Sequence, residues 1–174
     1  MDILSELNPE QRRAVQHDGG PLLILAGAGS GKTKTLTHRI AYLISQQGIF
    51  PSRILAVTFT NKAAREMRQR LADMLGEDAS DRRFMPWMGT FHSICVRLLK
   101  IDGMSIGLGR NFIIYDEDDR LGLIKQLMKS RGLTDRDIKP RRIAAAISAA
   151  KNDMLSPDEY MMQAVGPIKQ IIAE

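Results

Sequence analysis

The sequence has one cysteine, few aromatic residues and no long apolar run. The single Cys95 excludes an internal disulfide, and no cluster of Cys and His at metal-ligand spacing accompanies it. We expect its thiol to behave as a small buried apolar group. No segment approaches the roughly 20 apolar residues that cross a bilayer, and residues 1–13 lack the apolar stretch and cleavage site of a secretory signal. We therefore expect a cytoplasmic protein without a membrane partner.

The chain does contain enough apolar residues for a core, and it carries excess positive charge. Its 174 residues are 44% hydrophobic, which suits one domain, or one domain and part of another. The formal net charge of +5 would suit a polyanionic partner, but many ordinary proteins are as basic. The partner must therefore be inferred from motifs.

The first hundred residues alternate between helix-like and strand-like segments. Asn8 and Gln11 form a capping-box pattern with Pro9 at the first helical position, which predicts a helix to about His17. The other expected elements are buried strands at 22–25 and 54–58, a strand around 87–89, and helices at 32–45, 61–75 and 90–101. This alternation predicts an α/β fold, a parallel sheet flanked by helices with right-handed crossovers.

Beyond Gly103 the pattern becomes mostly helical. Helices are expected at 117–131, at 141–152 and from 157 to the end, with one short β-like run at 112–115. We place a domain boundary near Gly107, between residues 1–106 and 107–174. The last residues are apolar at helical spacing without a terminating signal, so we expect the chain to be a fragment.

A glycine-rich loop joins the strand predicted at 22–25 to the helix that follows. Its glycines let the backbone wrap closely around a phosphate chain, and the helix N-terminus adds partial positive charge. Lys32 is placed to reach the terminal phosphates and Thr33 to ligate Mg²⁺, which makes both candidates for catalysis. The sequence therefore predicts a P-loop for ATP and Mg²⁺, formed by Ala26, Gly27, Ala28, Gly29, Ser30, Gly31, Lys32 and Thr33.

Four blocks, in this order along the chain, resemble the superfamily-1 helicases of the UvrD/Rep/PcrA group. They are Leu7 to Gln11, the P-loop, Thr58 to Met67, and Gly89 to Ser93. The general P-loop pattern starts with glycine, but this family commonly has alanine there, so Ala26 supports the resemblance. The resemblance implies a RecA-like P-loop motor subdomain, 1A, in residues 1–106, followed by the start of a helical inserted subdomain, 1B, in residues 107–174.

The resemblance also implies roles for individual residues. Gln11 would contact adenine, because its amide carries a donor and an acceptor, although an ordinary capping box explains this glutamine equally well. Lys34 lies where the family usually has an arginine near the adenine, and a lysine loses planar stacking. The resemblance further implies contacts with single-stranded DNA. Phe59 could stack on a base, and Asn61 and Lys62 could hold a phosphate at the start of a helix. The fourth block adds DNA contacts by Thr90, Phe91 and His92.

Residues 112–117 have the form of a Walker B motif, an apolar strand followed by Asp116 and Glu117. The acidic run continues, however, and a helix follows at once, so Asp116 suits an N-cap with Asp119 at the N3 position. We therefore expect nucleotide binding with poor hydrolysis. Basic residues farther along could touch duplex DNA, although a solvated face is the simpler interpretation: Arg136, Lys139, Arg141, Arg142 and Lys151.

Three functions are open at this point. The resemblance implies an ATP-dependent 3′–5′ DNA helicase of bacterial type, associated with the nucleoid, acting where single-stranded DNA meets duplex. The second is a self-contained small P-loop ATPase or kinase that uses Asp116 and Glu117. The third is a DNA-binding module with a vestigial P-loop. The first predicts that this chain binds nucleotide but hydrolyses it poorly, the second predicts ATP turnover by the chain itself, and the third predicts no nucleotide binding.

Overall fold

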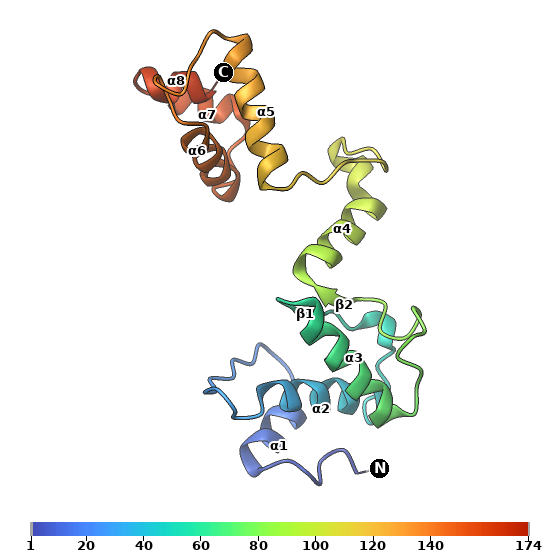
Figure 1. Cartoon of the computed structure of the whole chain (residues 1–174). Helices are drawn as coiled ribbons and strands as arrows, with labels where there is room; N and C mark the ends of the chain where they lie inside the picture. Colours follow the sequence, from blue (N-terminus) through green and yellow to red (C-terminus); the bar gives the residue numbers. More distant parts are fainter. Residues whose placement is uncertain (1, 174) are drawn as a thin grey trace. The chain divides into compact units, whose positions relative to one another are not determined.

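The computed structural model describes residues 2–173. Contacts divide the chain into two compact units, Met1–Arg110 and Asn111–Glu174. The first unit combines helices with a small sheet, and the described part of the second is helical (Figure 1). The two units meet between Arg110 and Asn111, and both the boundary near Gly107 and the assignment of subdomains 1A and 1B stay predictions.

Helix α1 (Pro9–Gln16) starts with the predicted capping box. The Gln11 N–H donates to Asn8 Oδ1 at 2.8 Å, and the Asn8 N–H donates to Gln11 Oε1 at 3.1 Å. A cap of this kind typically stabilises a helix by about 1 kcal/mol. Helix α2 (Lys32–Ser45) packs against α1, and the Arg39 guanidinium donates to the Val15 carbonyl at 2.6 Å. The two helices are therefore fixed to each other.

The sheet consists, within residues 2–173, of two parallel strands, β1 (Ala56–Thr58) and β2 (Met88–Thr90). Ala56 lies opposite Met88 and Thr58 opposite Thr90. Short 3₁₀ turn η1 (Pro51–Arg53) precedes β1, and α3 (Asn61–Leu75) follows it. Helix α4 (Phe91–Asp102) follows β2 and leads into η2 (Gly103–Ile106). The predicted alternation of helices with parallel strands is confirmed for these two strands.

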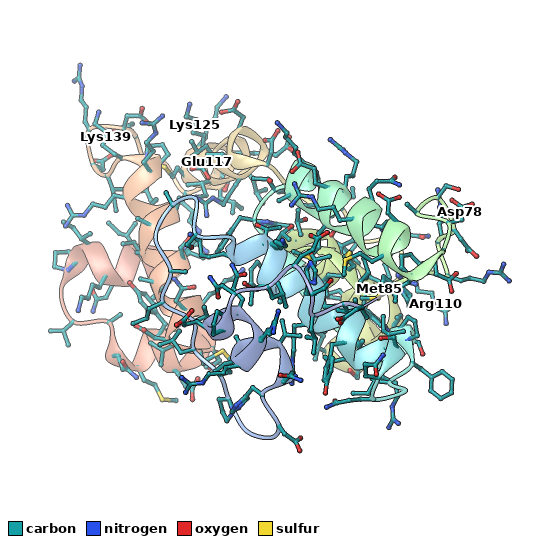
Figure 2. The ribbon with its side chains drawn as sticks, turned by 90° about the horizontal axis from the view of Figure 1, so that it is seen from below. Asp78, Met85, Arg110, Glu117, Lys125 and Lys139 are labelled. Carbon is teal, nitrogen blue, oxygen red and sulfur yellow. The ribbon has the colours of Figure 1, made fainter. Side chains whose placement is uncertain are left out.

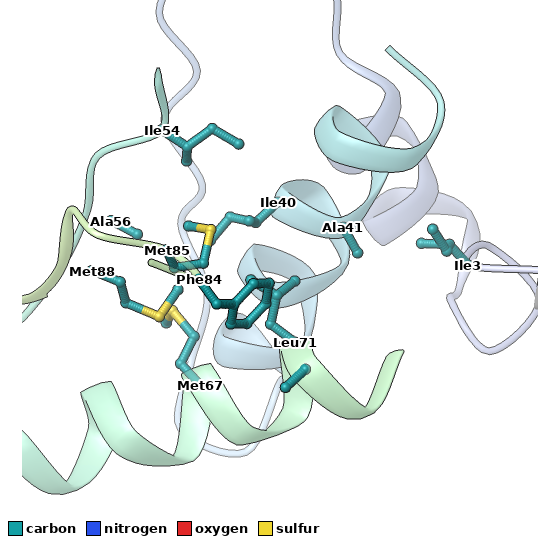
Figure 3. Close-up of a cluster of buried hydrophobic side chains, with 11 residues drawn as sticks. Ile3, Ile40, Ala41, Ile54, Ala56, Met67, Leu71, Phe84, Met85 and Met88 are labelled. Carbon is teal, nitrogen blue, oxygen red and sulfur yellow. The ribbon is translucent and has the colours of Figure 1, made fainter. Parts of the chain in front are cut away.

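The core of the first unit lies between α2, α3 and the sheet. Figure 3 shows Ile40 of α2, Met67 and Leu71 of α3, and Met88 of β2 directed into this space together with Phe84. Methionine side chains are flexible, so they fill the irregular gaps between these unlike elements. The core therefore joins the P-loop helix to the strands.

Arg68 ties α3 to the loop before β2. Its guanidinium donates to the carbonyls of Phe84, Met85 (2.9 Å) and Met88 (3.1 Å). Backbone carbonyls in a buried irregular loop need such donors. Burial lowers the pKa of Arg68 from its ordinary value. This side chain therefore fixes the path of the chain into β2.

The prediction of a buried strand at 22–25 is wrong. These residues form no strand, and Leu23 and Leu25 are 82% and 87% exposed. A strand requires hydrogen-bonded neighbours and cover on its faces. Among residues 2–173, however, β1 and β2 pair only with each other. The apolar run therefore lacks the neighbours that its pattern presupposes.

The expectation of a buried thiol at Cys95 is also wrong, because Cys95 is exposed. Helix α4 turns Ile94 into the core, and adjacent positions on a helix point in other directions. The prediction for Cys95 rested on its apolar neighbours Ile94 and Val96. Only one stripe of a helix can face the core.

The second unit contains α5 (Glu117–Ser130), α6 (Pro140–Asn152), α7 (Pro157–Gln163) and α8 (Pro167–Ala173). The residues at 112–115 form no strand, so that prediction is wrong, and Ile113 is 79% exposed. The helix expected from 157 onward is divided in two. Gly166 has a φ of 91° and Pro167 lacks an N–H donor, and both interrupt a helix.

The core of this second unit is apolar, and the charged residues that the structure describes there are exposed except for the half-buried Arg120. Ile124, Met128, Ile143 and Ala144 are buried together, whereas Figure 2 shows the side chain of Lys139 projecting outward. Throughout the described part of the chain, the helices are too short or too polar to cross a membrane.

Candidate functional site

The glycine-rich loop ends where α2 begins, at Lys32. Gly29 and Gly31 have φ values of 76° and 85°, which glycine adopts without steric strain. A Cβ placed on Gly27 or Gly29 would meet nothing within 4 Å, so the loop surface is open there. The N-cap residue Gly31 has no capping side chain, which leaves the N–H groups of the first turn to an anion. The loop therefore fits a phosphate chain.

Lys32 lies across this loop. Its Nζ donates to the carbonyls of Ala26 at 3.0 Å and Gly27 at 2.6 Å, and the Ser30 hydroxyl donates to the same Gly27 carbonyl at 2.8 Å. The lysine thus already lies beside the open backbone. A phosphate oxygen is a stronger acceptor than a neutral carbonyl because it is charged. Lys32 can therefore exchange these carbonyls for phosphate oxygens.

Thr33 is the candidate ligand for Mg²⁺. Its side chain is exposed at the start of α2, and its carbonyl accepts from the Thr37 hydroxyl at 2.8 Å. Within residues 2–173, three or more His, Cys, Asp or Glu side chains nowhere gather into a metal cluster. Mg²⁺ in nucleotide sites commonly takes most ligands from phosphate and water. One hydroxyl at the start of α2, beside a loop that could hold phosphates, would fit that pattern.

Gln11 and Lys34 lie beside the P-loop. Gln11 Nε2 donates to the Ser30 carbonyl at 3.1 Å. Lys34 Nζ donates to the Glu6 carbonyl at 2.9 Å and lies 3.1 Å from the Glu6 carboxylate. The structure therefore brings the N-terminal segment, α1 and the loop together. The adenine contacts of Gln11 and Lys34 stay predictions.

His38 of α2 is buried, and its Nδ1 lies 2.6 Å from the Ile3 carbonyl. This contact holds the N-terminal segment on α2, so His38 has a packing role. His17, directly after α1, is half-buried and lines a hollow beside Leu23 and Leu25. Neither histidine takes part in the loop contacts described above.

An exposed aromatic pair marks the carboxyl ends of the strands. Phe59 is 90% exposed and Phe91 is 47% exposed, with ring centroids 5.4 Å apart and ring planes at 45°. Each follows a strand directly, and the strands end on the paired residues Thr58 and Thr90. Parallel pairing therefore brings the two rings to one edge of the sheet. Exposed rings of this kind can stack on nucleic-acid bases.

The polar residues around this pair divide into exposed groups and caps. Asn61, Lys62 and His92 are exposed, and Lys62 lies 4.0 Å from Glu66 one turn along α3. Thr90, in contrast, is buried and caps α4 by accepting from the Ser93 N–H at 3.2 Å. Thr90 thus orients Phe91 and His92, and its direct contact with DNA stays a prediction.

Sequence reasoning missed Thr60, which caps α3. Its Oγ1 accepts from the Ala63 N–H at 3.1 Å, and its carbonyl accepts from the Thr58 hydroxyl at 3.0 Å. These bonds fix the turn that presents Phe59 and Asn61. The signal was present, since threonine just before a helical pattern is a favoured N-cap.

The acidic pair of the apparent Walker B motif has local partners. Asp116 Oδ1 accepts from the Asp119 N–H at 2.9 Å, and Asp119 Oδ2 accepts from the Asp116 N–H at 3.3 Å. Glu117 accepts from the Arg120 guanidinium at 2.7 Å. The interpretation of Asp116 as an N-cap is confirmed. This pair therefore has a structural role at the start of α5.

The predicted basic residues of the second unit are all exposed. None of the five is paired with a carboxylate among the ion pairs of the described residues, and their contact with duplex DNA stays a prediction: Arg136, Lys139, Arg141, Arg142 and Lys151.

The helices and the two parallel strands define an α/β class of protein, in which an open glycine-rich loop precedes the helix that begins with Lys32 and Thr33. Residues 7–172 match the family model of the UvrD/REP helicase N-terminal domain. The chain therefore belongs to this family, and the resemblance inferred from the four sequence blocks is confirmed.

Curated relatives agree with this assignment. The chain is 49% identical over 172 residues to the ATP-dependent DNA helicase PcrA of Bacillus subtilis (strain 168) and equally to that of Leuconostoc citreum. It is 44% identical over 171 residues to that of Staphylococcus aureus (strain Mu50 / ATCC 700699). These matches cover 99%, 99% and 98% of this chain. The chain spans only 23% of the length of each relative.

Proposed function

We propose that this chain is the nucleotide-gripping part of an ATP-dependent DNA helicase that moves 3′ to 5′ on single-stranded DNA. The observation that carries the proposal is the open P-loop with Lys32 lying across it and Thr33 beside it. The names of the relatives, ATP-dependent DNA helicases, support the same function for the whole protein. The finer assignment is a RecA-like 1A subdomain followed by the start of 1B.

The loop would bind the phosphates of ATP through its backbone N–H groups. Lys32 would transfer its hydrogen bonds from the Ala26 and Gly27 carbonyls to the terminal phosphates. Thr33 would ligate Mg²⁺ together with phosphate oxygens. Gln11 and Lys34 lie beside the loop, where the base would follow the phosphates.

Single-stranded DNA would lie on the sheet edge that carries Phe59 and Phe91. Each stacked base contributes about 1 to 3 kcal/mol without demanding a particular sequence. Asn61 and Lys62 stand at the start of α3, where the helix N-terminus and a positive charge favour a phosphate. His92 would donate a hydrogen bond to the same DNA strand. Unwinding would take place where the single strand meets duplex DNA, in a nucleoid-associated cytoplasmic enzyme.

Hydrolysis by the chain alone should be slow. Asp116 and Glu117 are engaged at the start of α5 and are not presented as a water-activating pair. The parent enzyme would supply that pair elsewhere in its sequence. The self-contained ATPase or kinase therefore becomes the weaker alternative.

Calorimetric titration of the chain with ATP and Mg²⁺ tests the nucleotide site. We expect binding by the unchanged chain and a loss of at least about tenfold in Lys32→Ala, because a charged donor to phosphate disappears. Lys125→Ala, which removes an exposed lysine from α5, is the matched control. Undetectable binding that Lys32→Ala leaves unchanged would favour a vestigial P-loop. Rapid Mg²⁺-dependent turnover abolished by Glu117→Gln would favour the self-contained ATPase.

A further inference from the structure

Gln11 makes a hydrogen bond that crosses from α1 to the P-loop. Its Oε1 accepts from the Asn8 N–H within the capping box, while its Nε2 donates to the Ser30 carbonyl at 3.1 Å. Both polar atoms of the side-chain amide therefore have protein partners. A base that bound the same two atoms would compete with these bonds. The side-chain amide of Gln11 therefore links α1 to the loop.

The bond to Ser30 has a consequence for the neighbouring Gly31 N–H. The two groups belong to one peptide unit, and in a trans peptide the C=O and N–H point in opposite directions. A donor that holds the Ser30 carbonyl toward α1 therefore turns the Gly31 N–H away from α1. Gly31 is the N-cap of α2, and N–H groups at a helix start are the ones that bind anions.

Helix α1, which carries Gln11, packs against α2. Helix α1 is anchored on α2 by the bond from Arg39 to the Val15 carbonyl, at 2.6 Å. The contact is also close, since a Cβ on Gly31 would lie 2.7 Å from Gln11 Nε2. The loop peptide therefore has little room to rotate while Gln11 keeps its place.

We propose that Gln11 is a positioning residue for the phosphate chain, because it orients the Gly31 N–H toward the phosphates. This inference rests on the proposed nucleotide site and deepens it. The role concerns phosphate and not the base, so it extends to a polyphosphate that has no base at all. A glutamine that reads only adenine would have no effect on such a ligand.

Inorganic tripolyphosphate with Mg²⁺ is the probe, titrated into the 174-residue chain by calorimetry. Gln11→Met is neutral and nearly isosteric but cannot donate to Ser30. Gln11→Asn keeps an amide that is too short to reach it. We expect both variants to bind tripolyphosphate about three- to tenfold more weakly, since one hydrogen bond is lost. Gln16→Met, on an exposed position of the same helix, should leave the affinity unchanged.

The Gly31 amide resonance, measured by ¹⁵N NMR without any ligand, gives a second readout. It should shift in both Gln11 variants and stay in place in Gln16→Met. If Gln11→Met fails to fold, as judged by circular dichroism, Gln11→Asn decides the question. Together these readouts separate a change at the loop peptide from a general loss of structure.

Unchanged tripolyphosphate affinity in the folded Gln11 variants, together with lost discrimination between ATP and GTP, would overturn the proposal. Gln11 would then read the base alone. A chain that binds neither tripolyphosphate nor ATP before any substitution would overturn the proposed function itself. The two failures are therefore distinguishable in one set of titrations.

Discussion

Replacing Phe59 with alanine directly tests the proposed DNA-binding edge of the sheet. The ring is 90% exposed, so its removal should cost the fold no more than the contact with Phe91, about 0.5 to 1.5 kcal/mol, and a larger loss of DNA affinity reports on binding. A base stacked on an aromatic side chain is stabilised by about 1 to 3 kcal/mol. This predicts a dissociation constant for single-stranded DNA that rises roughly five- to 150-fold in Phe59→Ala.

Fluorescence anisotropy of a labelled oligothymidine measures this change. Phe50 provides the matched control, because it is 69% exposed in the same unit but does not follow either strand. Phe50→Ala should therefore bind like the unchanged chain. Removing Phe59 should leave the salt dependence of binding unaltered, whereas Lys62→Ala should reduce the salt slope by about one, because a phosphate contact releases a counterion.

The contact between Phe59 and Phe91 adds a further constraint. Their centroids are 5.4 Å apart, and such aromatic pairs are coupled by about 0.5 to 1.5 kcal/mol. The double variant Phe59→Ala/Phe91→Ala should therefore lose less affinity than the sum of the single losses. If Phe59→Ala binds as tightly as Phe50→Ala, the aromatic pair is not a base platform and the reasoning fails.

Three further predictions concern stability. Arg68→Met removes hydrogen bonds to the carbonyls of the loop before β2 and should destabilise the first unit by about 3 kcal/mol. At a denaturant slope of roughly 1.5 kcal/mol/M, its urea midpoint should fall by about 2 M. The exposed Arg65→Met is the control. Gly31→Ala should cost about 1 kcal/mol in thermal melts, because its φ is 85°, and should weaken ATP binding in calorimetry. Hydrogen bonds from Ser156 and Thr134 lower the pKa values of Glu159 and Asp137. The two carboxylates therefore contribute fully to folding stability above the ordinary carboxyl pKa, and this contribution is lost as the pH falls through the lowered values. Urea midpoints that do not fall on acidification would contradict this.

The sequence predicted best those features that depend on residues a few positions apart. The capping boxes at Asn8 and Asp116 need only a partner three residues later, and both form as expected. The end of α3 at Gly76, with a φ of 71°, likewise follows from one residue. The break at Gly166 and Pro167 is equally local, although the apolar spacing on either side of it predicts one continuous helix.

Strand predictions failed where the partner lies elsewhere. The runs at 22–25 and 112–115 have suitable apolar composition, but composition cannot supply a neighbouring strand. The exposed Cys95 is a similar case, because only the packing of α4 decides which of its positions face the core. The bond between Gln11 and Ser30 joins residues 19 positions apart and depends on how α1 packs on α2. No local pattern encodes these contacts.

The aromatic pair shows how a long-range contact can still follow from local rules. Phe59 and Phe91 were each predicted to bind DNA, but their sequence positions do not say that they touch. The parallel register does, because Thr58 pairs with Thr90, each of these residues ends its strand, and a phenylalanine follows each of them. A register shift by one residue would send one of the two rings to the opposite face of the sheet. The platform proposed for DNA therefore depends on the same register that the core around Met88 stabilises, and loss of that register should abolish binding even with both rings intact.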